Sequence, residues 1–258
     1  MLQSMRIIVV ASQKGGSGKT TISGHLAVEA ERNGHGPVAV IDTDPQGSLA
    51  HWWNAREATE PAFVQSSLTS LRDDLNRLRE QGFRLIVIDT PPAVTRAISE
   101  VVAYADLVVL PTRPSPHDLR AVGATVDILE ARGKAMIFVL NGATARARIT
   151  GQAAVALSQH GTVAPTTVHH RVNFASSMID GRTVMETDPE SASAKEIGAL
   201  WGYIHDRLQR RHVVALPGRL HDASAAQQGS HVVNTIAPEG LRPSQPFGRR
   251  GRIEAQSY

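Results

Sequence analysis

The chain is 258 residues long and 41% of them are hydrophobic, which suits one large domain or two small ones with a substantial core. It contains no cysteine, so disulfides, thiolate metal sites and iron–sulfur clusters are excluded. No apolar run approaches the ~18 residues of a transmembrane helix, and the N-terminus leads almost directly into a predicted strand without a signal peptide. We therefore expect a cytoplasmic protein, whether it starts at Met1 or at Met5.

The net charge of +3 is unevenly distributed. Residues 1–210 contain 21 basic and 21 acidic residues and are neutral, whereas residues 211–258 contain six arginines and three acidic residues. The second stretch also holds several prolines and glycines and has no sustained periodicity. We predict a folded domain over 1–210 and a flexible basic tail over 211–258. Because the body is neutral, any nucleic-acid surface must come from local clusters of arginine.

The first motif follows the apolar run 7–11 and precedes helical spacing over 22–30. It reads Lys-Gly-Gly-Ser-Gly-Lys-Thr-Thr, and this glycine-rich turn between strand and helix is the context of a phosphate-binding loop. Glycines let backbone N–H groups converge on phosphate oxygens at the helix N-terminus, where the dipole also favours anions. The general pattern requires a further glycine where this chain has Gln13. We expect Lys19 to reach the β- and γ-phosphates and Thr20 to ligate Mg²⁺. The residues assigned to nucleotide binding in this loop are Gly15, Gly16, Ser17, Gly18, Lys19, Thr20 and Thr21.

Two further apolar runs end in acidic residues. The run 38–41 is followed by Asp42 and Asp44, and the run 83–88 by Asp89. Because ligands bind at the carboxyl ends of parallel strands, these carboxylates are expected beside the phosphate loop, where they would handle Mg²⁺ and water. An apolar strand closed by aspartate is the Walker B arrangement, in which Asp89 holds Mg²⁺. The alternative for Asp42 and Asp44 is that they cap the helix that starts near residue 46.

The remainder of the chain alternates helices with strands. Helical spacing is present over 67–80, 116–132, 149–160 and 192–210, apolar runs predict strands over 106–110, 135–140 and 162–168, and residues 56–67 are polar and irregular. Ser115 and Pro116 are suitable residues for the start of a helix. The alternation predicts an α/β fold, a mainly parallel sheet with helices on both faces.

The three motifs together resemble the ParA/MinD superfamily of ATPases, whose phosphate loop is a deviant Walker A motif with a second lysine near its start. The resemblance is specific at residues 14–20, 42–48 and 86–92 and looser after Asn141, and it covers roughly residues 5–210. It is closest to the short form of these proteins, without an N-terminal helix-turn-helix domain. The fold that it implies is that of a P-loop NTPase.

The resemblance also implies ATP, Mg²⁺ and a homodimer that forms with ATP. In the family the lysine that matches Lys14 reaches across the dimer interface to the partner's nucleotide. The aspartate that matches Asp44 helps to place the attacking water, and the one that matches Asp42 lies near the Mg²⁺ shell. Residues 90–93 would sense the γ-phosphate, and Asn141 would lie near the adenine. Hydrolysis would be slow until a ParB-like or cargo-adaptor protein stimulates it.

The family's ATP dimer binds DNA without sequence preference through basic residues of its C-terminal half. This implies a plasmid or chromosome partition ATPase that associates with the nucleoid. Arg171 is the first candidate for DNA binding, and the further candidates are Arg146, Arg148 and Arg182.

Three alternatives stay open. A positioning ATPase for a protein cargo would have the same core. A MinD-like protein would bind a membrane through an amphipathic helix over 205–216, although Pro217 would stop such a helix early, and we do not expect a membrane partner. A biosynthetic ligase such as dethiobiotin synthetase shares the fold but would not need Lys14. The adjacent His169 and His170 do not predict a metal site, since neighbouring residues on a strand point to opposite faces.

Overall fold

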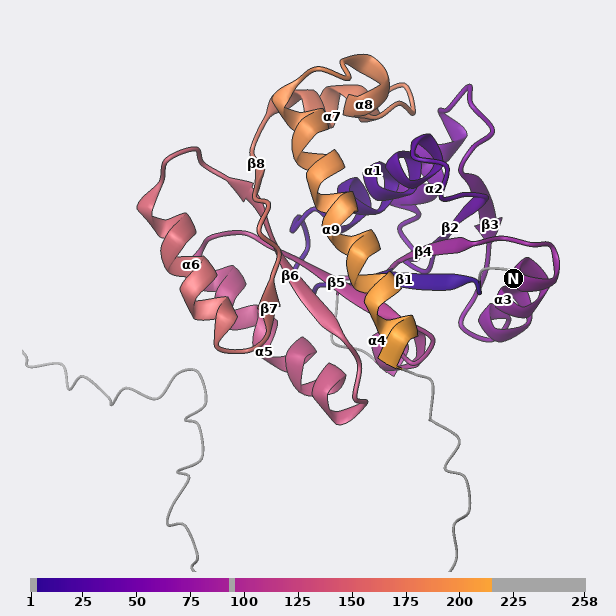
Figure 1. The fold of residues 1–258 in the computed structure, drawn as a ribbon, viewed down its shortest axis with the longest axis horizontal. Coiled ribbons are helices and arrows are strands. Elements are labelled where there is room, and N and C mark those ends of the chain that lie inside the picture. Colours follow the sequence, from indigo (N-terminus) through magenta and orange to yellow (C-terminus); the bar gives the residue numbers. More distant parts are fainter. Residues whose placement is uncertain (1–3, 93–95, 215–258) are drawn as a thin grey trace, which may run out of the picture.

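The computed structural model describes residues 4–92 and 96–214 of the protein (Figure 1). The strands are β1 (Arg6–Val10), β2 (Val38–Asp42), β3 (Ala62–Gln65), β4 (Leu85–Asp89), β5 (Leu107–Thr112), β6 (Met136–Ala143), β7 (Thr162–Val163) and β8 (Val168–His169). The helices are α1 (Lys19–Arg32), α2 (Ser48–Asn54), α3 (Leu71–Glu80), α4 (Arg96–Val102), α5 (Pro116–Ala131), α6 (Arg148–Ser158), α7 (Val172–Met178), α8 (Val184–Thr187) and α9 (Ala192–Val214).

The strands form one parallel sheet around β1. Their order is β3-β2-β4-β1-β5-β6-β7, and β8 pairs with the end of β6. Each pairing is parallel, which confirms the predicted sheet. The strands that follow β1 along the chain lie first on one side of it and then on the other, so the topological switch point is at β1. Ligands in open α/β sheets bind outside the carboxyl ends of the strands at such a point.

Helices cover both faces of the sheet, also as predicted. Alternate residues of β1 point to opposite faces, with Ile8 and Val10 in one buried cluster and Ile7 and Val9 in the other. The first cluster contains buried side chains of α1, α2, α7, α8 and α9, and the second those of α3, α4, α5 and α6. Figure 1 shows α9, in orange, lying over the sheet close to α1. This double covering holds the strand ends of the central sheet in fixed positions.

Several local predictions were wrong. The stretch 56–67 is not irregular throughout, because residues 62–65 form β3 and extend the sheet beside β2. The expected strand over 162–168 is divided into β7 and β8, which pair with different parts of β6. Sequence periodicity did not reveal α4, and α9 continues four residues beyond the expected end at Arg210. The tail beyond residue 214 and the end of the 90–93 segment lie outside the described residues. Within the residues described, no helix is long and apolar enough to cross a membrane.

Candidate nucleotide-binding site

The phosphate loop connects β1 to α1 at the switch point of the sheet. Gly16 and Gly18 adopt left-handed backbone angles, with φ of 73° and 95°. The amide Nδ2 of Asn141, at the carboxyl end of β6, donates a hydrogen bond to the carbonyl of Ser17 over 2.7 Å. A Cβ on Gly18 would lie 2.1 Å from that amide nitrogen. Gly18 is therefore required both by its backbone angle and by the close approach of Asn141.

The loop has the properties expected of a phosphate cradle. The hydroxyl of Ser17 is buried and has no hydrogen-bond partner among the residues that the structure describes. Gly15 is exposed, and a Cβ there would have nothing within 4 Å. Lys19 is 7% exposed, and its burial lowers the pKa of the ammonium although Asp89 and Asp44 oppose that shift. A buried cation that forms no salt bridge among the described residues, beside an unpartnered hydroxyl, suits an anionic ligand.

Asp89 ends β4 directly beside the first turn of α1. The hydroxyl Oγ1 of Thr20 donates to Oδ2 of Asp89 over 2.6 Å, and that of Ser23 donates to Oδ1 over 3.3 Å. Asp89 is 1% exposed, and its burial raises the pKa of the carboxyl to about 7 although Thr20 and Lys19 oppose the shift. A carboxylate and a hydroxyl are hard oxygen ligands, which Mg²⁺ prefers. The residues present therefore fit the predicted Mg²⁺, and the roles of Thr20 and Asp89 as its ligands stay predictions.

Asp42 and Asp44 lie near this corner but make other contacts. Asp42 is in register with Asp89 across β2 and β4, yet its carboxylate accepts backbone N–H groups of Asp44, Leu49 and Ala50. This is the capping alternative, and the role of Asp42 at Mg²⁺ stays a prediction. The carboxylate of Asp44 accepts the N–H of Gln46. It is also close enough to Lys19 for its charge to oppose the lowering of the Lys19 pKa by burial. Its proposed role with water also stays a prediction.

Lys14 is bound within its own chain. Its Nζ lies 2.9 Å from Oδ2 of Asp118, in the first turn of α5. Asp118 is almost fully buried and also accepts a hydrogen bond from the Ser115 hydroxyl, the predicted N-cap of this helix. The Lys14 side chain remains 43% exposed. The lysine is thus anchored at one atom and otherwise accessible from outside.

The four arginines predicted to bind DNA differ in their contacts. Arg171 forms two hydrogen bonds with Glu196, of 2.5 and 2.7 Å, and Arg182 pairs with Asp180 at 2.6 Å. Arg146 and Arg148 are exposed and form no ion pair within the described part of the chain. They lie at the start of α6, where Arg146 adopts a left-handed φ of 60°. The guanidinium groups best placed for an external anion are therefore those of Arg146 and Arg148.

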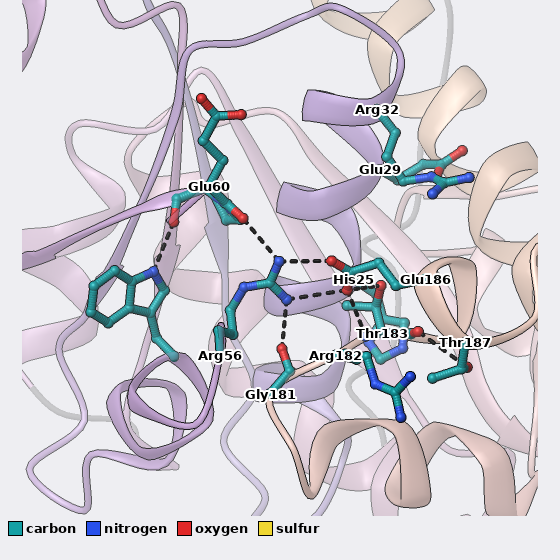
Figure 2. A network of polar contacts seen from close by, with 12 residues as sticks. His25, Glu29, Arg32, Arg56, Glu60, Gly181, Arg182, Thr183, Glu186 and Thr187 are labelled. Atoms are coloured by element: carbon teal, nitrogen blue, oxygen red, sulfur yellow. Dashed lines mark hydrogen bonds and ion pairs between the residues drawn. The ribbon is translucent and has the colours of Figure 1, made fainter. Parts of the chain in front are cut away.

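A buried arginine network joins the segment after α2 to the segment before α8 (Figure 2). Arg56, whose side chain is 2% exposed, donates to both carboxylate oxygens of Glu186 and to the carbonyls of Gly181 and Glu60. It also stacks on Trp52, 4.9 Å from the ring centroid. Burial alone would raise the pKa of Glu186, but hydrogen bonds from Arg56 and Thr183 hold it below its ordinary value. The sequence motifs contained both charges without indicating that they meet.

His25 connects this region to the helix that follows the phosphate loop. Its Nδ1 lies 2.8 Å from the carbonyl of Thr21, and its Nε2 accepts the N–H of Val184 at 3.2 Å. The ring is fully buried, and this burial lowers the pKa of His25 to about 4. Nδ1 therefore carries the single proton of a neutral ring. Thr21, predicted to bind nucleotide, is thus also tied through its carbonyl to the α8 region.

A sequence match to a family model identifies the relatives of this chain. Residues 8–236 match the CobQ/CobB/MinD/ParA nucleotide binding domain. The chain belongs to the ParA/MinD family. Among its relatives is the maintenance of carboxysome distribution protein A of Halothiobacillus neapolitanus, with 30% identity over 73% of this chain and 91% of that protein. Another is the chromosome-partitioning ATPase Soj of Thermus thermophilus, with 25% identity over 91% of this chain and 95% of that protein.

Solved structures of ParA/MinD proteins share the fold. A Cyanothece McdA variant in complex with ATP has a TM-score of 0.65 and 18% identity, covering 79% of this chain and 97% of that one. The cell division ATPase MinD of Pyrococcus furiosus has a TM-score of 0.65 and 22% identity, covering 78% and 99%. The predicted family and the predicted P-loop NTPase fold are thereby confirmed.

Proposed function

We propose that this ParA/MinD protein is a switch ATPase that dimerises with ATP and, as a dimer, binds DNA without sequence preference to partition or position a cargo. The observation that carries the proposal is the hydrogen bond of 2.6 Å between Thr20 and Asp89 beneath a phosphate loop that has two lysines. A phosphate cradle and a buried strand-end carboxylate meet there at the switch point of the sheet. That combination supports binding and hydrolysis of a nucleoside triphosphate.

In this proposal most of the catalysis is electrostatic positioning. The loop amides and Lys19 bind the phosphates, and Thr20 and Asp89 hold Mg²⁺, which when bound neutralises phosphate charge. Asp44 orients the attacking water through its carboxylate. A strong general base is not required, so slow hydrolysis by the isolated protein is consistent with these residues.

Dimerisation would use Lys14. In a single chain this lysine is held by Asp118, 2.9 Å away, and is 43% exposed. An interaction with the phosphates of a partner's nucleotide would replace one carboxylate by a more highly charged anion. The switch would thus exchange an ion pair within the chain for one between chains, and ATP would supply the anion that favours the exchange.

DNA binding by the dimer would begin with Arg146 and Arg148, which are exposed and unpaired within the described residues. Arg171 and Arg182 would first have to leave Glu196 and Asp180. A few phosphate contacts per subunit bind weakly and are sensitive to salt, and two linked subunits bind much more tightly than one. DNA affinity would therefore follow the nucleotide state, and the protein would associate with the nucleoid.

The second candidate function is positioning of a protein assembly. It is favoured by a match with 30% identity to a protein named for carboxysome distribution, and this match covers 91% of that relative. A ParB-like partner would be expected for a DNA cargo and an adaptor on the assembly for a protein cargo. Deleting the gene in the source cell discriminates: loss of DNA inheritance supports partition, and clustering of a protein assembly supports positioning.

The dimer is tested by analytical ultracentrifugation of the wild type and of Lys14→Ala with ADP, ATP and a slowly hydrolysed ATP analogue. Lys195→Ala is the matched control, because that lysine pairs with Glu190 on an exposed surface. We expect dimers of the wild type and of the control with ATP or the analogue, and monomers of Lys14→Ala. An intact ATP dimer of Lys14→Ala would refute the role across the interface.

A further inference from the structure

Arg113 lies between the phosphate loop and the end of β6. It follows the last residue of β5, and β5 is flanked in the sheet by β1 and β6. Thr112 is in register with Leu140, so Arg113, just beyond β5, lies level with Asn141 of β6. The parallel topology therefore brings Arg113 beside Asn141 and the phosphate loop, although they are far apart in sequence.

The side chain of Arg113 spans the gap between two glycines. A methyl group on Gly142 would lie 3.6 Å from Nε and 3.7 Å from Cγ of Arg113, and one on Gly16 would lie 3.8 Å from Nη2. Both glycines have left-handed φ values, 64° and 73°. The stem of the arginine thus lies against the turn after β6, and its guanidinium lies beside the phosphate loop.

The guanidinium of Arg113 is exposed. Across the residues that the structure describes, Arg113 forms no side-chain hydrogen bond and no ion pair. Lys14, at the start of the phosphate loop, is held by Asp118. Arg171 and Arg182 are likewise paired with acidic residues. Arg113 is therefore a cation without a partner in the described part of the chain, close to loop amides that are arranged for phosphate.

We propose that Arg113 binds the phosphate chain of the nucleotide held by its own subunit. The inference rests on the proposed function and adds a ligand-binding residue to that site. A guanidinium presents a planar fork of donors that matches two phosphate oxygens, and such charge-assisted bonds are strong. Arg113 would supply this charge within a single chain, while Lys14 is still bound to Asp118. Nucleotide binding by the monomer would then depend on Arg113, and dimerisation on Lys14.

The test is calorimetric titration of ADP and ATP, with Mg²⁺, into the wild type, Arg113→Gln and Arg113→Lys. ADP is included because its binding does not require a dimer. Arg120→Gln is the control, since Arg120 is exposed on α5 and, among the described residues, its side chain hydrogen-bonds only the carbonyl of Pro116 in its own helix. We expect Arg113→Gln to bind both nucleotides about tenfold more weakly or worse, with Arg113→Lys intermediate and the control unchanged.

The melting temperature and the nucleotide affinity together separate the outcomes. The melting temperature of Arg113→Gln should be close to that of the wild type, because the side chain forms no hydrogen bond or ion pair with the described residues and glutamine keeps part of its stem. Wild-type affinity in Arg113→Gln, in a preparation where Lys19→Ala loses binding, would overturn the role of Arg113 and leave the proposed function intact. No nucleotide binding by the wild type would overturn both.

Discussion

The Arg56–Glu186 pair yields a stability prediction whose size follows from its burial. Arg56→Met keeps much of the volume of the side chain but removes all its donors, leaving Glu186 and the carbonyls of Gly181 and Glu60 without their charged partner. The Arg56 side chain is 2% exposed and Glu186 is 22% exposed. Removing one partner of a buried ion pair costs about 3–5 kcal/mol. That is a large fraction of the ~5–15 kcal/mol by which folded domains are stable.

The assay is urea unfolding of the wild type, Arg56→Met, Glu186→Met and the double variant. Lys195→Met, which breaks the exposed pair with Glu190, should change stability by less than about 0.5 kcal/mol. The double variant should be no less stable than Arg56→Met, because it removes the carboxylate that the single substitution leaves unpaired. A loss below about 1 kcal/mol in Arg56→Met would refute the argument from burial. A double variant that is less stable than Arg56→Met would contradict the charge argument.

Three further predictions follow from the buried groups of the site. Burial lowers the pKa of His25 from its ordinary 6.5 to about 4. The stability that neutral His25 contributes is therefore present above pH 6.5 and is lost as the pH falls towards 4. Over this range we expect the free energy of unfolding of the wild type to fall by roughly 3 kcal/mol more than that of His25→Gln. Gly18→Ala should abolish ATP binding, because the new Cβ would lie 2.1 Å from the Asn141 amide nitrogen. Gly133→Ala is the control: its φ is 59°, and a Cβ there would have nothing within 4 Å. It should strain only the backbone and bind ATP normally in the same titration. Asp89→Asn should remove the dependence of ATP affinity on Mg²⁺, and an unchanged Mg²⁺ dependence would exclude Asp89 as a ligand.

The sequence indicated those parts of the site that lie within one continuous segment. The phosphate loop and the strand closed by Asp89 have local signatures, because spacing along the chain determines where their groups lie. Hydrophobic runs likewise identified the central strands, which are buried on both faces. The edge strand β3 was missed because its apolar run is only three residues long; those three are partly buried and the fourth, Gln65, is exposed.

Contacts between distant segments were not predictable in the same way. Nothing near Arg56 in sequence indicates that it meets Glu186, and nothing near Arg113 indicates that it lies beside Gly16. The Arg113 contact depends on the order of the strands, and the Arg56 contact depends on the path of the C-terminal helices. The pairing of Arg171 with Glu196 has the same origin, and the family resemblance, which ranked Arg171 above Arg146 and Arg148, gave no sign of that pairing.

DNA binding as a function of nucleotide state tests the central claim most directly. The protein is titrated onto unrelated duplexes without nucleotide and with ADP, ATP and a slowly hydrolysed analogue, at two salt concentrations. The switch predicts that DNA binds only with ATP and the analogue, with equal affinity for all duplexes. Binding should be weakened by salt and reduced in the variant that combines Arg146→Ala with Arg148→Ala. Binding that is independent of nucleotide, or absent in every state while the ATP dimer forms, would contradict it.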